Sequence, residues 1–335
     1  MTVEYYPSPA NQNKAPEVDI PKRHNHRDWS GATVGLVFGL AGLFGARLGQ
    51  LWIGFDIFAQ FWMQFLFITF ASALGLASPR YKSLVAMVLL CLMVVGYSVW
   101  PYYVSAEPHP QLQPLRASER PIKVASFNTF LHNSDYNAIA QEVIRLDPDV
   151  ITLVEFGPDK AKALDLLHQK FPFQENCWKI IDCDFAILSK TPLTDISAMA
   201  YWDGPPFMSA TLGSAFGNLT VVGLHTDRFP RQRAQLKQML AFVKRLEQHQ
   251  GRMIVMGDIN ATPFSRITKT LVDGLNLDRL TYLPTWSASY GFPQLAIDHI
   301  FVSAGIHALD QERIGEYAGS DHFPITMTLA IPISQ

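Results

Sequence analysis

The sequence predicts a mixed α/β fold, with sheets packed between helices, preceded by three transmembrane helices. Two observations lead to this fold class. Three long uncharged segments lie in the first third of the 335-residue chain, and strand-like and helix-like patterns alternate in the rest. The hydrophobic share of 48% against 17% charged residues is high for a soluble protein, and the excess falls in the uncharged segments.

The uncharged segments are long enough to form membrane-spanning helices. They lie between Asp28 and Arg47, between Asp56 and Arg80, and between Lys82 and Glu107. A helix needs roughly 20 residues to cross a hydrocarbon core of about 30 Å, so we predict transmembrane helices near 30–50, 57–78 and 83–104. A cleaved signal peptide would explain one apolar segment near the N-terminus but not three.

Basic residues beside these helices predict their orientation. Lys22, Arg23 and Arg27 precede the first helix, and Arg80 and Lys82 lie between the second and the third. Because basic residues favour the cytoplasmic side, three crossings place the chain after residue 104 outside the cytoplasm, in the periplasm or the extracellular space.

The predicted organisation has four parts. They are a disordered cytoplasmic tail (1–28), a three-helix membrane anchor (29–104), an extended linker that contains several prolines (105–120) and a folded domain (121–335). The linker and the tail are the two parts for which we expect no packed core.

Two features of the sequence allow two interpretations each. Gly31, Gly35 and Gly39 give the first helix a smooth face, which can pack against the chain's own helices or support a homodimer. Cys177 and Cys183 are close enough in sequence for a β-hairpin to bring them together. They can form a disulfide, which an extracytoplasmic domain would allow, or stay as two thiols.

The folded domain begins with alternating strands and helices. We predict a strand at 122–128, a helix at 135–146, a strand at 149–155 and a helix at 158–169. Residues 173–224 then contain five short strand-like segments, WKIID, FAILSK, ISAMAYW, FMSATL and LTVVGLH, which predict an antiparallel meander.

The last third returns to longer elements. We expect a helix near 230–249, a strand after which Gly257 lets the backbone turn, a helix after Pro263 and late strands at 296–303 and 323–331.

Polar residues follow the strands of this domain. Asn128, Glu155, His225 and the pair Asp258 with Asn260 stand at the ends of predicted strands, and Asp298, Asp321 and His322 come later. Polar groups at neighbouring strand ends can converge, and hard oxygen ligands select Mg²⁺ or Mn²⁺. Each residue also has a structural interpretation, such as an Asx turn or a carboxylate at a helix N-terminus.

The segments that carry these residues resemble the endonuclease/exonuclease/phosphatase superfamily, the deoxyribonuclease I-like proteins. They are Asn128 in the first strand, LVEF around Glu155, GLHTD around His225, GDIN at 257–260, IDHI at 297–300 and GSDHFPI at 319–325. The resemblance covers residues 121–333 and none of the apolar part. It implies a four-layer α/β/β/α sandwich and Mg²⁺-dependent attack of water on a phosphate ester.

The resemblance also implies a role for each residue. Glu155 would be the principal metal ligand, with Asn128 beside it and Asp321 near the metal. Asp258 would orient or deprotonate the water, Asn260 would hydrogen-bond the phosphate, and His225 would contact the phosphate or assist the leaving group. His322, oriented by Asp298, would stabilise charge on the phosphate. Val154 and Asp184 stand where many relatives carry Gln and Gly, and neither replaces a catalytic group.

Charge bears on the substrate. Residues 121–335 contain 18 Lys and Arg against 22 Asp and Glu, a formal net charge of −4, whereas tight nucleic-acid binding usually needs a basic surface. Arg231 belongs to a short basic cluster that can contact a polyanion or form a solvated helix face. Trp286, in an aromatic loop, can stack on substrate or pack within the loop.

The sequence therefore predicts a membrane-anchored, Mg²⁺-dependent (or Mn²⁺-dependent) hydrolase of a phosphodiester or phosphomonoester, with the lipid bilayer and a phosphate ester as partners. Two alternatives remain. One is an extracytoplasmic nuclease acting on DNA or RNA, and the other is a catalytically silent, membrane-tethered binding or scaffold protein.

Overall fold

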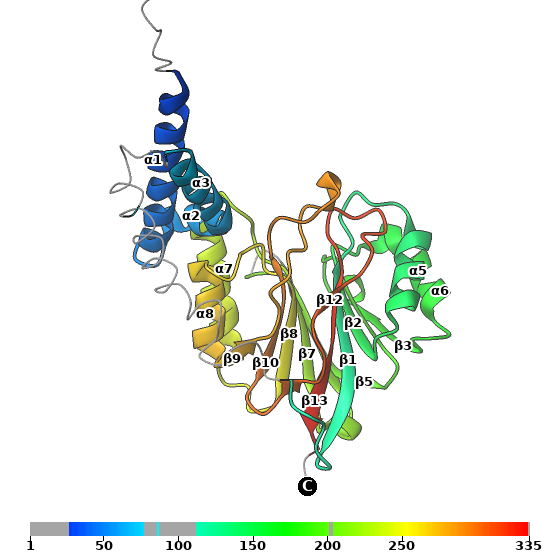
Figure 1. Cartoon of the computed structure of the whole chain (residues 1–335). Coiled ribbons are helices and arrows are strands. Elements are labelled where there is room, and N and C mark those ends of the chain that lie inside the picture. Colours follow the sequence, from blue (N-terminus) through cyan, green and yellow to red (C-terminus); the bar gives the residue numbers. More distant parts are fainter. Residues whose placement is uncertain (1–26, 77–85, 87–111, 201–203, 334–335) are drawn as a thin grey trace, which may run out of the picture.

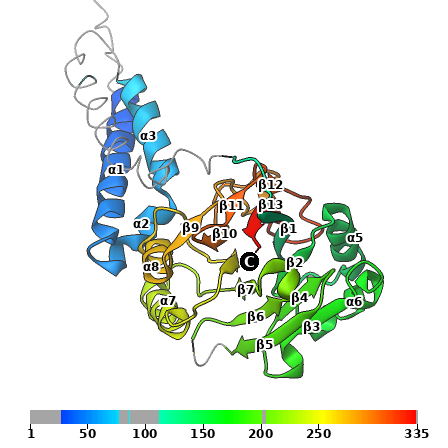
Figure 2. The ribbon, with the colours of Figure 1, turned by 90° about the horizontal axis from the view of Figure 1, so that it is seen from below.

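The computed structural model describes residues 27–76, 86, 112–200 and 204–333. Two β-sheets face each other, and helices cover the outer face of each sheet (Figure 1). The resulting layers run helix, sheet, sheet, helix, as expected for the folded domain. A separate group of helices, from residues 27–76, lies against one outer layer of this sandwich (Figures 1 and 2).

The first sheet has the strand order β11-β13-β1-β2-β4-β3, with β12 paired to β13. Its strands are β1 (Glu119–Asn128), β2 (Val150–Val154), β3 (Phe173–Asn176), β4 (Phe185–Ser189), β11 (His307–Ala308), β12 (Arg313–Ile314) and β13 (Ile325–Pro332). Strands β1 and β2 are parallel, and the other pairs are antiparallel.

The second sheet has the order β5-β6-β7-β8-β10-β9. Its strands are β5 (Leu193–Met199), β6 (Phe207–Leu212), β7 (Thr220–Leu224), β8 (Met253–Asp258), β9 (Leu277–Arg279) and β10 (Asp298–Ser303). Here β7 and β8 are parallel, and the remaining pairs are antiparallel.

Helices α5 (Tyr136–Leu146) and α6 (Lys162–Leu167) cover the first sheet, and α7 (Gln232–Leu246) and α8 (Arg266–Leu275) cover the second (Figure 1). Short 3-10 turns are η3 (Pro158–Lys160), η4 (Cys177–Lys179), η6 (Ser214–Phe216) and η7 (Ala288–Tyr290). Strand β1 shows why both faces of a sheet are apolar. Ile122 and Val124 lie in the core between the sheets, whereas Ala125 and Phe127 lie in the core under α5 and α6.

The predicted meander at 173–224 is wrong in its arrangement. Strands β3 and β4 belong to the first sheet and β5 to β7 belong to the second, so the chain changes sheets after Ser189. The segment WKIID does not form a strand. Residues 173–176 form the strand that pairs with β4, and the 3-10 turn η4 follows them. Cys177 and Cys183 form a disulfide with their Cα atoms 5.9 Å apart.

The helices before the sandwich are α1 (Arg27–Gly49), η1 (Ile53–Phe55), α2 (Asp56–Gln60) and α3 (Trp62–Gly75). The glycine face of α1 packs against α3 of the same chain. A Cβ atom at Gly35 would lie 2.3 Å from Ser72 Oγ, and one at Gly39 would lie 2.2 Å from Thr69 Oγ1. Within the chain, this face therefore packs against the chain's own helices, which is one of its two interpretations.

The prediction of three transmembrane helices is not confirmed. Within the described residues, Gly31–Gly49 is the one helix long and apolar enough to cross a membrane. The predicted second span is broken, because 53–60 and 62–75 meet at a 64° bend and satisfy the same criteria only as a pair. The predicted third helix, at 83–104, lies outside the described residues apart from Ala86. Multi-pass anchoring and the placement of the domain outside the cytoplasm stay predictions.

Candidate active site

The two parallel strand pairs bring the predicted site residues together. Asn128 ends β1, and Glu155 follows its parallel neighbour β2. In the facing sheet, His225 follows β7, and Asp258 ends its parallel neighbour β8. Because the carboxyl ends of parallel strands lie at the same edge of a sheet, both pairs present their polar residues at one end of the sandwich.

Gly257 allows β7 and β8 to approach each other closely. Its φ is +145°, and a Cβ atom there would lie 2.1 Å from the carbonyl oxygen of Leu224. Strand β8 continues through Gly257 to Asp258, so the predicted turn at Gly257 is wrong. The residue is required because neither a side chain nor an ordinary φ fits at this position of the strand.

The turn comes after Asp258. The Oδ1 atom of Asp258 accepts a hydrogen bond of 2.8 Å from the backbone N–H of Asn260, which is an Asx turn. Asn260 adopts a left-handed φ of 51° and donates from Nδ2 to the carbonyl oxygen of Thr226 at 3.1 Å and to Asp258 Oδ2 at 3.2 Å. Asp258 and Asn260 therefore form an Asx turn and also line the pocket, so the structural and the functional interpretations of this segment are compatible.

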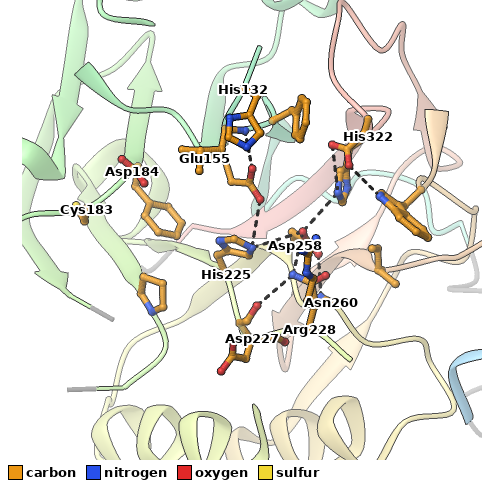
Figure 3. A pocket seen from close by; sticks show the side chains of 18 of the residues that line it. His132, Glu155, Cys183, Asp184, His225, Asp227, Arg228, Asp258, Asn260 and His322 are labelled. Carbon is orange, nitrogen blue, oxygen red and sulfur yellow. Dashed lines mark hydrogen bonds and ion pairs between the residues drawn. The ribbon is translucent and has the colours of Figure 1, made fainter. Parts of the chain in front are cut away.

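Glu155 lies between the two sheets with its carboxylate close to His225 (Figure 3). Its φ of 52° is in the left-handed region, a strained conformation of the kind that is often found at functional sites. The carboxylate accepts hydrogen bonds from Asn128 Nδ2 at 3.1 Å and from the backbone N–H of Leu131 at 2.6 Å. Burial opposes ionisation, but the charge of His225 and these hydrogen bonds outweigh it and lower the pKa of Glu155.

His225 and Asn128 connect the two sheets at the site. His225 Nε2 lies 3.6 Å from Glu155 Oε1 and 3.7 Å from Asp258 Oδ2. Asn128 Nδ2 also donates to Asp258 Oδ2 at 2.9 Å, while its Oδ1 accepts from the backbone N–H of Phe130 at 2.9 Å. Asn128 thus bridges the two carboxylates through its nitrogen.

A buried ion pair forms the other half of the site. Asp298 stands directly opposite Asp258 in the β8–β10 ladder. Its Oδ2 atom accepts hydrogen bonds from His322 Nδ1 at 2.7 Å and from Thr285 Oγ1 at 2.6 Å. Burial acts against its charge, but His322 and the two hydrogen bonds keep the pKa of Asp298 below its ordinary value.

The same contacts hold His322 in its protonated form. Burial alone would lower the pKa of His322, but the charges of Asp298 and Asp258 and the hydrogen bond to Asp298 raise it to about 10. The other ring nitrogen, Nε2, lies 3.6 Å from Asp258 Oδ2. Burial, together with the negative charge of nearby Asp298, raises the pKa of Asp258 to about 6. An imidazolium and a carboxyl group of near-neutral pKa therefore lie side by side.

A pocket of about 870 Å³ opens over these groups. Seven of the ten predicted site residues line it: Glu155, His225, Asp258, Asn260, Trp286, Asp321 and His322. Asn128 and Asp298 lie behind this surface and contact it through their partners. Trp286 Nε1 donates to Asp321 Oδ2 at 3.1 Å.

The basic residue at the pocket differs from the predicted one. Arg228 lines the pocket, whereas Arg231 is exposed and lies 3.6 Å from Asp227 as an ion pair. The sequence reasoning also did not single out His132 and Phe229, which line the pocket. The position of Phe229 four residues after His225 was the one signal available for it, and no motif marks His132.

The sequence matches the model of the Endonuclease/Exonuclease/phosphatase family over residues 125–322, which is more than half of the chain. The chain belongs to this family. The matched region contains every predicted site residue from Asn128 to His322 and leaves out the N-terminal helices. Among curated proteins, a sequence search found no match.

Solved structures share the fold of this family member. An endonuclease/exonuclease/phosphatase family protein from Bacteroides thetaiotaomicron is 18% identical, with 64% of this chain and 98% of that chain covered and a TM-score of 0.51. A mannosyl-6-phosphatase from Bacteroides thetaiotaomicron is 18% identical, with 62% and 99% covered and a TM-score of 0.50. A functionally unknown conserved protein from Enterococcus faecalis is 18% identical, with 63% and 100% covered and a TM-score of 0.53.

Among the residues that the structure describes, two groups of side chains have the spacing to hold a metal ion. Glu155, His225 and Asp258 offer ligand atoms within 4.8 Å of one another, as do Asp258, Asp298 and His322. The second group is buried, and two of its members, His322 and Asp298, are already hydrogen-bonded to each other. The first faces the pocket and contains two carboxylates, which suit a hard divalent cation. Asn128 would need to turn its amide to offer an oxygen there, so its role as a ligand stays a prediction.

Proposed function

We propose that this protein is a membrane-anchored hydrolase of phosphate esters that depends on Mg²⁺ or Mn²⁺. Its family consists of hydrolytic enzymes by description, and the site contains the groups that such a reaction needs. The observation that carries the proposal is the arrangement around Asp258. This buried carboxyl group lies between the Glu155–His225 pair on one side and the His322–Asp298 ion pair on the other.

The residues divide the chemistry between them. With a pKa near 6, Asp258 is ionised at neutral pH and basic enough to accept a proton from an attacking water. His322 is protonated at the same pH, so its Nε2–H can donate to a phosphate oxygen as negative charge develops there. Asn260 would donate a further hydrogen bond to the phosphate, and His225 would assist the leaving oxygen. Glu155 would hold the cation, which neutralises charge on the phosphate.

The pocket favours a small or lipid-linked ester over a nucleic acid. Among the described residues that line it, Arg228 is the one lysine or arginine, whereas six are acidic: Glu155, Asp182, Asp184, Asp227, Asp258 and Asp321. Because nucleic-acid affinity depends on neutralising many phosphates, this lining does not provide the basic track that a nuclease usually has. The mannosyl-6-phosphatase of similar fold supports a phosphatase as one outcome.

The test is a substrate panel with the full chain in detergent. We expect hydrolysis of p-nitrophenyl phosphate or bis-p-nitrophenyl phosphate with Mg²⁺ or Mn²⁺, and none in EDTA. Glu155→Gln should lower kcat by about 100-fold or more, whereas Glu247→Gln, at the exposed end of α7, should leave it unchanged. Cleavage of DNA or RNA alone would instead support the nuclease. Ligand binding without turnover of any ester would support the scaffold protein.

A further inference from the structure

The N-terminal helices contact the sandwich at the loop that follows Asp258 and Asn260. Gln60 Oε1 accepts a hydrogen bond of 2.8 Å from the backbone N–H of Thr262. Thr262 Oγ1 in turn donates to the carbonyl oxygen of Ala59 at 3.0 Å. Both bonds are buried, and Thr262 is only two residues from Asn260. The short helix α2 is therefore hydrogen-bonded to the backbone that leaves the active site.

Asp56 makes two further contacts with this part of the sandwich. Its side chain is fully buried, with Oδ2 accepting from Ser265 Oγ at 2.5 Å and Oδ1 accepting from the backbone N–H of Arg266 at 2.7 Å. Ser265 is the N-cap of α8 and also accepts from the N–H of Ile267. Burial raises the pKa of the Asp56 carboxyl group, whereas its two hydrogen bonds and the charge of Arg266 act in the opposite direction and favour the carboxylate. A buried carboxylate without such partners would be costly.

The loop between Asn260 and Ser265 is fixed from two further directions. Gln235 of α7 donates from Nε2 to the carbonyl oxygens of Ile259 and Asn260, at 3.0 and 3.1 Å. His299 Nε2 lies 3.0 Å from the carbonyl oxygen of Ala261. The contacts from α2 form the third support. Asn260 has a left-handed backbone conformation, which persists in a residue other than glycine only where the surrounding structure holds it.

Aromatic contacts extend the same interface to the pocket wall. Phe61, at the bend between α2 and α3, packs edge-on against Phe229 with ring centroids 5.5 Å apart. Trp62 stacks on Phe264 of the loop, with ring centroids 5.1 Å apart. Phe229 lines the pocket and lies next to Trp286. Residues 56–62 thus contact both the loop between Asn260 and Ser265 and one wall of the pocket.

We infer that Asp56 is a positioning residue, which acts with Gln60 to hold the loop that presents Asp258 and Asn260. The N-terminal helices are then part of the catalytic unit as well as a candidate anchor. The family match covers residues 125–322, so Asp56 and Gln60 lie outside the matched region, whereas the loop that they contact lies inside it. The inference rests on the proposed hydrolase function, since a positioning residue needs a reaction to support.

The test compares variants of the full chain in detergent, with a p-nitrophenyl ester as substrate. Asp56→Ala should lower kcat about tenfold or more while KM changes less than about threefold. Asp56→Asn, whose amide oxygen can still accept from the Arg266 N–H, should recover part of that loss. Asp273→Asn is the matched control, because Asp273 is an exposed aspartate of α8, the helix that Asp56 contacts at its start, and it forms a surface ion pair with Lys269 at 2.7 Å. It should keep the wild-type kcat.

Two further measurements separate positioning from simple stability. Hydrogen exchange of the 258–266 amides should become faster in Asp56→Ala at a temperature where the fold is intact. If that variant does not fold, Gln60→Leu replaces it with the same expected direction. The kcat losses of Asp56→Ala and Ser265→Ala should also be non-additive in the double variant. Each single substitution already removes the same hydrogen bond, from Ser265 Oγ to Asp56 Oδ2.

The outcomes distinguish this inference from the proposed function. An inactive wild-type protein would overturn the hydrolase and this inference together. An active wild type whose Asp56→Ala variant melts at a lower temperature but retains kcat would overturn the positioning role alone. Additive losses in the double variant would do the same.

Discussion

Replacing Asp298 with Asn tests whether the ion pair with His322 controls the chemistry. The two side chains share a hydrogen bond of 2.7 Å in a buried environment, and Asp298 is a main reason why the pKa of His322 is raised to about 10. In Asp298→Asn the carboxylate is gone while the shape is kept. Burial, which lowers the pKa of His322, is then opposed mainly by the negative charge of Asp258. The pKa of His322 should therefore fall toward its ordinary value of 6.5 or below.

The size of the effect follows from the fraction of His322 that stays protonated. At pH 8, a histidine with a pKa of about 10 is about 99% protonated, whereas one with a pKa of about 6.5 is about 3% protonated. If the imidazolium is the active form, kcat/KM at pH 8 should fall about 30-fold from this cause alone. At pH 6 most of the histidine is protonated in both proteins, so the difference should become small.

The assay is a pH–rate profile of kcat/KM for the wild type and the variant. For the wild type we expect activity to rise through about pH 6 as Asp258 ionises and to fall toward pH 10 as His322 loses its proton. In Asp298→Asn the alkaline limb should move down by about 3.5 pH units, from about 10 toward 6.5. Thr285→Val serves as the control, because it removes one hydrogen bond to Asp298 but keeps the charge. An alkaline limb that stays near pH 10 in Asp298→Asn would refute the reasoning.

Three further predictions follow from the same geometry. Gly257→Ala should lower the free energy of unfolding by about 3 kcal/mol or more, because its Cβ would meet the carbonyl oxygen of Leu224; an unchanged thermal midpoint would contradict this. Arg228→Ala should raise KM several-fold with little change in kcat, whereas Arg231→Ala, which removes an exposed ion pair, should change neither. A reporter fused after residue 335 should be active outside the cytoplasm, and activity only inside would reverse the predicted orientation.

The local sequence was sufficient for most of the domain. The apolar strands that end at Asn128, just before Glu155 and at Asp258 were predicted with their approximate limits, because burial on both faces gives continuous apolar segments with polar ends. The resemblance then placed distant residues in one site, and the structure brings them to one end of the sandwich. Their catalytic roles stay predictions that the experiments above address.

Other features depend on contacts between distant segments, and the sequence pattern does not contain them. Strands β4 and β5 follow one another along the chain but join different sheets, because β4 pairs with β2 and β3 whereas β5 pairs with β6. The local pattern of a strand does not specify its partner. Gly257 was expected to turn the chain, but its role is to admit the Leu224 backbone of a neighbouring strand.

The apolar composition of residues 57–78 predicted a membrane span, and composition by itself could not show that the chain bends between the helices at 53–60 and 62–75. Only the tertiary structure shows that Asp56 is buried against Ser265 and Arg266, more than 200 residues away. The sequence by itself therefore determined the family, the strand ends and the candidate catalytic groups, because these are encoded in local pattern. The tertiary structure decided which sheets the strands join and where the N-terminal helices dock, because those depend on long-range packing and buried hydrogen bonds.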